Sequence, residues 1–417
     1  MQYAFVLGRE PAISTAELIA ALNAADAGFD AKTSIFTPAV MIATVEKQLD
    51  AEFFHRLGGS IKMARVVKES QAIDKDLLKL LGAAAGDPTS PDGLRGARTN
   101  LDFGLSLYDM GAEPARARMF GKWLKPLSLE LKKELKAGGL SVRAVLADGL
   151  ALTSVQVDKN KLVSKGAEFL ILAGPKTTWL ARTIAVQAFE DFSERDFGRP
   201  NADAKSGMLP PKLARMMINI AAGPETETLM DAFCGSGTVL NEAATLGYRD
   251  LVGSDLSEKA ISDTKANFAW LVKERGLKVD FEAFVSDVKD LPQHVKPGSI
   301  STIVSEPYLG PPLKGGESDQ KIHFEYLELM GLYRRTFDAF SKILKPGGKV
   351  VFVFPVFGSK HVNILRELED YGFRAEGLLP GMAVTALNAH SSTGLVYKRP
   401  DQRVGRDIFR FRFNPNR

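Results

Sequence analysis

The feature that most constrains the fold is a short glycine loop between an apolar run and a helical pattern. The apolar run ends at Asp231, the loop is Gly235-Ser236-Gly237, and helical periodicity begins at Thr238. Glycine allows the backbone to approach a ligand closely, and the N-terminus of the helix offers free N–H groups. A second apolar run ends at Asp255, near the spacing of roughly 20 residues expected between such a loop and a ribose-binding carboxylate. The pattern predicts strand, loop, helix and strand around a nucleoside-containing cofactor. Because the full dinucleotide fingerprint is absent, a plain strand-to-helix turn is the alternative.

Composition limits the class of protein. The chain has 417 residues, which predicts two or three domains, and its 45% hydrophobic and 25% charged content is ordinary for a globular protein. A net charge of +4 is compatible with a nucleic-acid partner. The single cysteine, Cys234, excludes an internal disulfide and a cysteine-rich metal site. The five histidines show no ligand spacing, so we expect no metal.

The N-terminus carries no targeting signal that we can recognise. It lacks a basic region ahead of its short apolar run, and no long uncharged apolar stretch follows anywhere in the chain. We therefore expect a cytoplasmic protein without a membrane partner.

The N-terminal half reads as two small α/β domains. Residues 1–69 predict a βαββαβ, ferredoxin-like order, with strands near 3–7, 34–36, 40–45 and 61–67 and with helices capped by Ser14 or Thr15 and by Asp50. Residues 70–175 predict a second module, with a helix at 74–85, a loop at 86–96, and a long helix at 117–139 broken near Pro126. Further strands are expected at 101–108, 142–146, 169–172 and 179–186.

Basic residues of the long helix allow two readings. They form either a solvated helix face or an RNA-contacting face, and they include Lys122, Lys125, Lys132 and Lys133.

The C-terminal half predicts a doubly wound α/β domain. Residues 176–207 are expected to be a linker, and Pro210 and Pro211 suit the first turn of a helix that opens the domain at 208–417. Strands and helices then alternate until about residue 399. In the last residues Phe and Arg alternate, which favours a final edge strand over an RNA-binding arm.

Two further strands carry polar residues at their ends. One ends at Asp287, and the other ends in Ser305-Glu306-Pro307-Tyr308. Ligands of doubly wound sheets bind outside the carboxyl ends of the strands, at the switch point. If the last of these strands lies beside the first, Glu306 faces the glycine loop. Asp255 would then accept ribose hydroxyls and Asp287 an adenine amino group, although a helix cap explains Asp287 nearly as well.

The order of these motifs carries a resemblance to a known family. The series DAFCGSGT, GSD, SD, SEPY and LKPGGKVV resembles S-adenosylmethionine-dependent methyltransferases that act on exocyclic amines. Together with the segment ahead of the loop and the N-terminal modules, the chain resembles the tRNA guanosine-10 N2-methyltransferases of archaea and eukaryotes, whose N-terminal half contains a THUMP RNA-binding domain.

The resemblance implies a Rossmann-like methyltransferase domain at 208–417, a THUMP-like domain at 70–175, S-adenosyl-L-methionine as cofactor and tRNA as partner. It assigns catalysis to Glu306, Pro307 and Tyr308. Cofactor contacts would fall to Asp231, Cys234, Gly235, Gly237, Asp255, Leu256, Asp287 and Val288. A small activating protein subunit stays open, as do the target nucleotide, the number of methyl groups and the oligomeric state.

One departure from the family pattern matters. The family has Asp-Pro-Pro-Tyr at this strand, and the aspartate can be matched either to Glu306 or to Ser305. We favour Glu306, because a carboxylate is the hydrogen-bond acceptor that the chemistry needs. Tyr308 is expected to stack on the target base, with core packing as its alternative.

Two arginines ahead of the loop are assigned to the RNA path. Arg195 and Arg199 precede the cofactor module directly, and interdomain salt bridging is the equally good alternative.

Other functions remain open from the sequence. An adenine-N6 methyltransferase acting on DNA or rRNA would use the same fourth-strand signature, although the N-terminal modules favour RNA. A non-catalytic RNA-binding protein with a degenerate site is another reading, and a nicotinamide dehydrogenase is a more distant one.

Overall fold

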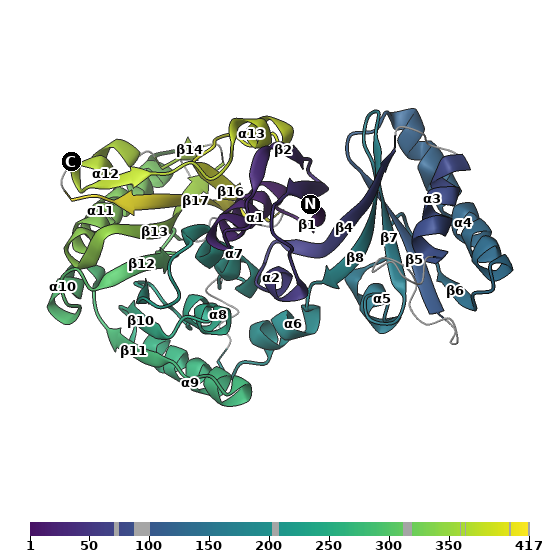
Figure 1. Cartoon of the computed structure of the whole chain (residues 1–417). Coiled ribbons are helices and arrows are strands. Elements are labelled where there is room, and N and C mark those ends of the chain that lie inside the picture. Colours follow the sequence, from purple (N-terminus) through teal and green to yellow (C-terminus); the bar gives the residue numbers. More distant parts are fainter. Residues whose placement is uncertain are drawn as a thin grey trace. The chain divides into compact units, whose positions relative to one another are not determined.

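The computed structural model describes residues 1–70, 75–86, 101–201, 208–311, 319–358, 360–362, 364–399 and 402–415. The chain divides into two compact units (Figure 1). Unit 1 contains residues 1–11, 25–55 and 60–189, and unit 2 contains residues 12–24, 56–59 and 190–417. Two short segments of the predicted first domain therefore belong to unit 2.

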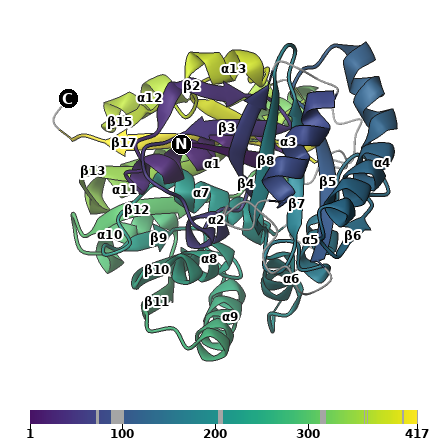
Figure 2. The same cartoon turned by 45° about the vertical axis from the view of Figure 1, so that its right-hand side comes forward.

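Unit 1 is built on a sheet whose described strands run in the order β2-β3-β1-β4-β8-β7-β5-β6 (Figure 2). The strands are β1 (Gln2–Leu7), β2 (Asp30–Phe36), β3 (Val40–Thr44), β4 (Ser60–Ser70), β5 (Leu101–Asp109), β6 (Val142–Val145), β7 (Ala167–Ala173) and β8 (Thr178–Val186). The first four pair antiparallel in the order of a ferredoxin-like unit, as predicted. However, β4 also pairs with β8, so the predicted boundary at residue 69 falls inside one continuous sheet.

Helices cover this sheet through their apolar faces. They are α2 (Ala51–His55), α3 (Lys75–Gly86), α4 (Pro114–Ala137) and α5 (Ser154–Lys159). Leu81 of α3 and Phe120 and Leu131 of α4 pack in one core with Phe169 of β7. The sequence predicted a break near Pro126, but α4 continues through this residue, and the packing of its apolar face explains why. Proline inside a helix costs about 3 kcal/mol, and burial of the apolar face of the helix offsets that cost.

Other differences from the sequence prediction concern element boundaries. The first helix, α1 (Pro11–Ala24), begins at Pro11, a residue suited to a first helical turn, so Ser14 and Thr15 lie buried inside the helix instead of capping it. Strand β8 matches the strand expected at 179–186, but β8 and helix α6 (Phe189–Phe197) lie within the range predicted to be a linker. Most of the predicted loop at 86–96 and residues 202–207 of the linker lie outside the described residues.

Unit 2 contains a second sheet, with described strands in the order β11-β10-β9-β12-β13-β17-β15. Strand β14 adds to β13 and β16 adds to β17. The strands are β9 (Leu229–Asp231), β10 (Asp250–Asp255), β11 (Asp280–Val285), β12 (Ile300–Ser305), β13 (Leu344–Phe357), β14 (Lys360–His361), β15 (Phe373–Ala375), β16 (Gly394–Tyr397) and β17 (Val404–Phe413). The pairs from β11 to β13 are parallel, which confirms the predicted Rossmann-like α/β class.

The strand order reverses between β9 and β12, which is the switch point of the sheet. From β9 the chain passes through α8 (Thr238–Leu246) to β10, and from β12 it passes through α11 (Asp319–Ile343) to β13 on the other side. The remaining helices are α7 (Pro211–Ala221), α9 (Glu258–Arg275), η1 (Val288–Asp290), α10 (Leu291–His294), α12 (Leu365–Asp370) and α13 (Gly381–Ala386). Tyr333 and Phe337 of α11 pack edge to face on Phe352 of β13 and fix that side of the core.

The Phe–Arg tail forms β17, as the alternation favoured. It is not an edge strand, because it pairs with β13 along its length and also with two further strands. Strand β16 pairs with the first part of β17 and β15 with its last residues. Phe409, Phe411 and Phe413 are buried in the core of unit 2. The alternating arginines therefore fall on the other face of the strand.

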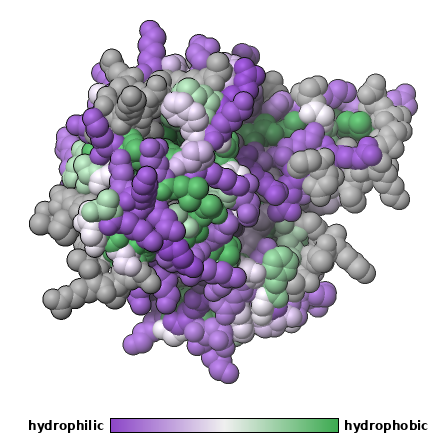
Figure 3. Space-filling model, turned by 90° about the vertical axis from the view of Figure 1, so that its right-hand side faces the viewer, coloured by the Kyte–Doolittle hydropathy of each residue, from purple (hydrophilic) through white to green (hydrophobic). Residues whose placement is uncertain are grey.

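In the described part of the chain, no helix combines the length and the apolarity that a membrane crossing requires. Among the coloured residues on the face drawn in Figure 3, hydrophilic side chains predominate, with smaller hydrophobic areas between them.

Candidate active site

A cavity of about 730 Å³ lies at the carboxyl ends of the unit 2 strands, around the switch point. Its wall brings together most of the residues that the sequence singled out: Asp231, Cys234, Gly235, Asp255, Leu256, Asp287, Val288, Glu306, Pro307 and Tyr308. Gly237 supports the loop without lining the cavity. Sequence reasoning missed several other lining residues, among them Met208, Ser257, Lys259, Asp263, Leu332 and Arg335.

The glycine loop has a conformation that only glycine adopts easily. Gly235 and Gly237 have φ values of 53° and 86°. A Cβ atom on Gly237 would stand 3.0 Å from Cγ2 of Thr264, whereas none of the described atoms lies within 4 Å of a Cβ built on Gly235. Helix α9 holds the loop, because Thr264 Oγ1 donates to the Gly235 carbonyl at 2.7 Å and Asn267 Nδ2 donates to the Ser236 carbonyl at 2.9 Å.

Asp255 stands at the end of β10 with its carboxylate fixed by backbone amides. Its oxygens accept from the amides of Gly235 and Ser257, each at 2.9 Å. A carboxylate has about four acceptor positions, so Asp255 keeps capacity for further donors such as ribose hydroxyls. The neighbouring Leu256 is 72% exposed and offers apolar surface at the cavity rim.

Asp287 caps the short helix η1, which was the alternative considered for it, and its contact with adenine stays a prediction. Its side chain accepts from the amide of Lys289 at 3.2 Å and caps η1, and it also lines the cavity. Val288 beside it is buried.

A buried hydrogen-bond pair joins β9 to β12. Ser305 Oγ donates to Asp231 Oδ1 at 2.9 Å, and the Ala232 amide donates to Ser305 Oγ at 2.9 Å. Burial raises the pKa of Asp231 to about 7, and the negative charges of Asp255 and Glu306 add to this rise. The Ser305 hydroxyl is fully buried and already paired, which argues against Ser305 as an acceptor for a substrate amine.

Cys234 contributes packing and a backbone contact. Burial raises the pKa of its thiol, so the thiolate needed for nucleophilic chemistry is suppressed.

The carboxylate of Glu306 lines the cavity but has a partner that the sequence did not reveal. Arg406 of β17 binds it through two parallel contacts, Nε to Oε2 at 2.5 Å and Nη2 to Oε1 at 2.8 Å. The two side chains are 15% and 6% exposed. Burial lowers the pKa of Arg406, but the hydrogen bonds and charge of Glu306 outweigh it and raise the pKa overall. The pair fixes the orientation of the predicted acceptor while leaving one lone pair on each oxygen.

The turn after Glu306 presents an aromatic ring to the outside. Tyr308 is 57% exposed, so the alternative of core packing is wrong. The Tyr333 hydroxyl donates to the Tyr308 carbonyl at 3.0 Å and holds the turn against α11.

The prediction that Arg195 and Arg199 contact RNA is not supported, because both side chains are buried. Arg195 pairs with Asp191 and, at 2.5 Å, with the buried Glu242. Arg199 donates to Thr238 Oγ1 at 2.8 Å, at the start of α8. Arg195 thus forms salt bridges, which was the alternative that the sequence left open. These salt bridges lie within unit 2 and do not join two domains.

The fold and the site together define a class. A Rossmann-like sheet, a glycine loop, carboxylates after successive strands and an acid-proline-aromatic turn at the switch point are the parts of a nucleoside-cofactor domain. Residues 199–357 match the model of the UPF0020 family, described as the RMKL-like methyltransferase domain.

Two curated relatives share part of the chain. It is 33% identical over 151 residues to a tRNA (guanine(10)-N2)-dimethyltransferase of Methanothermobacter thermautotrophicus, covering 36% of this chain and 42% of the relative. It is 27% identical over 165 residues to a protein of the same name from Methanocaldococcus jannaschii, covering 39% of this chain and 41% of the relative. The matches thus span less than half the length of either relative. The crystal structure of TrmN from Thermus thermophilus superposes with a TM-score of 0.54 at 16% identity, covering 99% of this chain and 100% of that one, which shows a similar fold.

Proposed function

We propose that this chain is an S-adenosylmethionine-dependent methyltransferase that modifies the exocyclic N2 amine of a guanosine in tRNA. The observation that carries the proposal is the Glu306-Pro307-Tyr308 turn, which opens into the same cavity as the glycine loop and Asp255. The methyltransferase-domain match and the names of the two curated relatives support it.

The residues of the cavity fit the proposed cofactor. A volume of about 730 Å³ lies in the range of small-molecule sites, and no described side chain fills the space beside Gly235. Asp255 would accept the ribose hydroxyls, Asp287 and Val288 would hold the adenine, and the Gly235 backbone would approach the remainder. When bound, the cofactor would supply an electrophilic methyl group: the N–C bond would form as the S–C bond breaks, and the methylated amine would then release one N–H proton to water.

The residues at the end of β12 would prepare the amine. The lone pair of an aromatic amine is delocalised into its ring, so the amine is a poor nucleophile. The Glu306 carboxylate and a backbone carbonyl of the turn would accept its two N–H groups and point the remaining lone pair at the transferred carbon. Arg406 holds the carboxylate in position beforehand, so positioning and electrostatics supply the rate.

Tyr308 would stack on the target base. The base must leave its own stack to reach the cavity, and an exposed ring beside the acceptor gives it a new partner.

The wider RNA surface belongs to the same proposal. Residues 70–175 would act as the THUMP-like RNA-binding part, with the exposed Lys122, Lys125 and Lys133 of α4 contacting phosphates. At the cavity rim of unit 2, Arg335 is exposed and has no carboxylate partner within ion-pair distance in the described residues. A tRNA substrate would place the protein in the cytoplasm.

The test is methyl transfer by the purified full chain, with labelled cofactor and with tRNA, rRNA fragments and DNA as acceptors. We expect label on tRNA, and mass spectrometry of digested nucleosides should find it in N2-methylated guanosine. Label in N6-methyladenosine would replace the proposal with the adenine enzyme. Cofactor binding without transfer to any acceptor would favour the degenerate site.

A pair of exposed aromatic residues tests the role of Tyr308. Loss of a base-stacking ring costs about 1–3 kcal/mol, so Tyr308→Ala should weaken substrate binding at least roughly fivefold. Phe197, 79% exposed and absent from the cavity wall, is the matched control, and Phe197→Ala should leave transfer unchanged. Equal effects of both substitutions would remove Tyr308 from the mechanism.

A further inference from the structure

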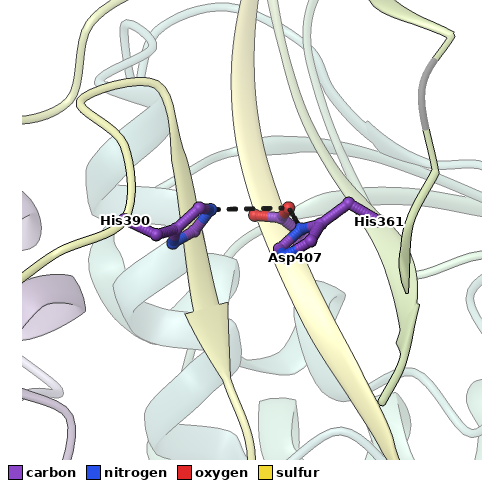
Figure 4. Close-up of side chains that lie close together, drawn as sticks. All are labelled: His361, His390 and Asp407. Carbon is purple, nitrogen blue, oxygen red and sulfur yellow. Dashed lines mark hydrogen bonds and ion pairs between the residues drawn. The ribbon is translucent and has the colours of Figure 1, made fainter. Parts of the chain in front are cut away.

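A second group of chemically active side chains lies outside the cavity. His361 of β14, His390 of the segment before β16 and Asp407 of β17 come together in unit 2 (Figure 4). None of the three lines the cavity described above. Their sequence positions show no ligand spacing. The pairing of β13 with β14 and β17 brings His361 to Asp407, and the pairing of β16 with β17 brings the segment of His390 to the same strand.

Both imidazole rings point at the same carboxylate. Nδ1 of His361 lies 2.6 Å from Oδ2 of Asp407, and Nε2 of His390 lies 3.9 Å from that oxygen. The two ring centroids are 4.9 Å apart at an interplanar angle of 35°. One ligand atom from each residue lies within 4.8 Å of the other two.

This donor set suits a divalent transition-metal ion. Two imidazole nitrogens and a carboxylate oxygen are ligands that zinc binds at about 2.0–2.2 Å, and tetrahedral geometry then separates the ligand atoms by about 3.3 Å. The contact of His390 is longer than this value and the contact of His361 is shorter. To reach this separation from Asp407 Oδ2, the His390 nitrogen would approach that oxygen and the His361 nitrogen would retreat from it, each by less than about 1 Å.

The carboxylate itself provides an independent sign of a missing partner. The side chain of Asp407 is 3% exposed, and its Oδ1 has no hydrogen-bond partner in the described structure. Oδ1 is confined by β16, because a Cβ built on Gly394 would stand 2.7 Å from it. A buried carboxylate with one unpaired oxygen is costly, and a dication would compensate the charge.

The access to the site fits a bound ion. The His361 and His390 side chains are 38% and 41% exposed, so an ion can enter from solvent and its fourth position can hold water.

We propose that His361, His390 and Asp407 form a binding site for one divalent transition-metal ion of the zinc class. The ion would join β14, the segment before β16 and β17. Because adjacent residues of a strand point to opposite faces, the ion would lie across β17 from Arg406, the residue that holds Glu306. Its role would be to fix β17 from the face opposite the cavity.

The test uses the full chain, stripped of metal with a chelator and titrated with Zn²⁺ in a calorimeter. We expect one equivalent to bind, Co²⁺ to show ligand-field absorption of a low-symmetry site with nitrogen ligands, and thermal unfolding to shift upward with Zn²⁺. His390→Ala should weaken binding by at least about 100-fold, because it removes a direct ligand.

A matched control and a second variant keep the result interpretable. His323 is exposed on α11 and stands outside the cluster, so His323→Ala should bind Zn²⁺ as the unmodified chain does. Asp407→Asn should also lose the ion, and circular dichroism of each variant should show retained secondary structure. Absence of Zn²⁺ binding in the micromolar range, or binding unaffected by His390→Ala, would overturn the proposal and leave His361 and Asp407 as a structural pair.

Discussion

The Glu306–Arg406 pair provides the sharpest test of the candidate site, because one contact carries both stability and function. The perturbation is a cycle of three variants: Glu306→Gln, Arg406→Gln and the double variant. Glu306→Gln keeps the shape of the side chain but removes its charge, and Arg406→Gln removes the cation while leaving a polar group. The double variant contains two neutral amides that can bond to each other.

The magnitude follows from burial. With side chains 15% and 6% exposed, the pair is largely withdrawn from water. Removing one member leaves an uncompensated buried charge, which costs about 3–5 kcal/mol. Removing both lifts that penalty, so the double variant should lose only about 1–2 kcal/mol. The coupling free energy of the cycle is therefore expected to be at least about 3 kcal/mol.

Two measurements on the same four proteins separate the roles of the pair. Urea unfolding gives the free energy of unfolding, and single-turnover transfer of labelled methyl groups to tRNA gives the rate of the chemical step. If the carboxylate accepts the substrate amine, the double variant should be stable yet about 100-fold slower, the scale for losing one preorganised electrostatic partner.

Two outcomes would refute this reasoning. Additive losses below about 1 kcal/mol would show that the pair does not form in solution. A double variant that regains both stability and rate would show that Glu306 only holds the turn in shape.

Three further predictions concern the loop, a buried acid and the rim. Gly237→Ala should cost about 1–3 kcal/mol of stability and weaken cofactor binding, because φ is 86° and the added Cβ meets α9. The control is Gly111→Ala in unit 1, where φ is 87° and the space around the added Cβ is open. This variant should lose stability without changing the cofactor affinity measured by calorimetry. Equal cofactor affinities of the two variants would contradict the assignment of the glycine loop to cofactor binding. Because burial raises the pKa of Asp231 from 3.8 to about 7, its stabilising contribution is complete below the lower value and is lost as pH rises through the upper one. Between about pH 4 and pH 7, the free energy of unfolding measured with urea should therefore fall with pH, and Asp231→Asn should remove up to about 1.4 kcal/mol per pH unit of that fall. An unchanged slope in the variant would show that other groups cause the fall. Arg335→Glu should weaken tRNA binding in filter assays about tenfold and reduce the salt dependence of binding. Arg334→Ala should change neither, because Arg334 pairs with a glutamate on α12 and does not line the cavity. The same effect from both variants would remove the cavity rim from the proposed RNA path.

The parts of the site that the sequence predicted are those whose signal is local. The loop glycines need left-handed backbone angles, and a carboxylate directly after an apolar strand must stand at the carboxyl edge of a parallel sheet. Gly235, Asp255, Asp287 and Glu306 could therefore be placed around one cavity before any tertiary structure was known.

Local patterns also explain where prediction of the fold was wrong. Pro126 breaks an isolated helix, but α4 continues through it because its apolar face packs on the sheet. The boundary predicted at residue 69 followed the end of the βαββαβ order, whereas β4 also pairs with β8, a strand more than a hundred residues away. The hydrophobic pattern of a strand does not show which distant strand it pairs with.

The sequence by itself determined the Rossmann-like class and the cavity residues of the glycine loop and the strand ends, because turn geometry and strand ends depend on neighbouring residues. Only the tertiary structure decided which charges meet: Arg406 with Glu306, Arg195 with Glu242, and His361 and His390 with Asp407. An arginine has the same side chain whether it binds a phosphate or a buried carboxylate. Its partner is selected by the packing of segments far apart in the chain, and that packing has no signature in the residues on either side.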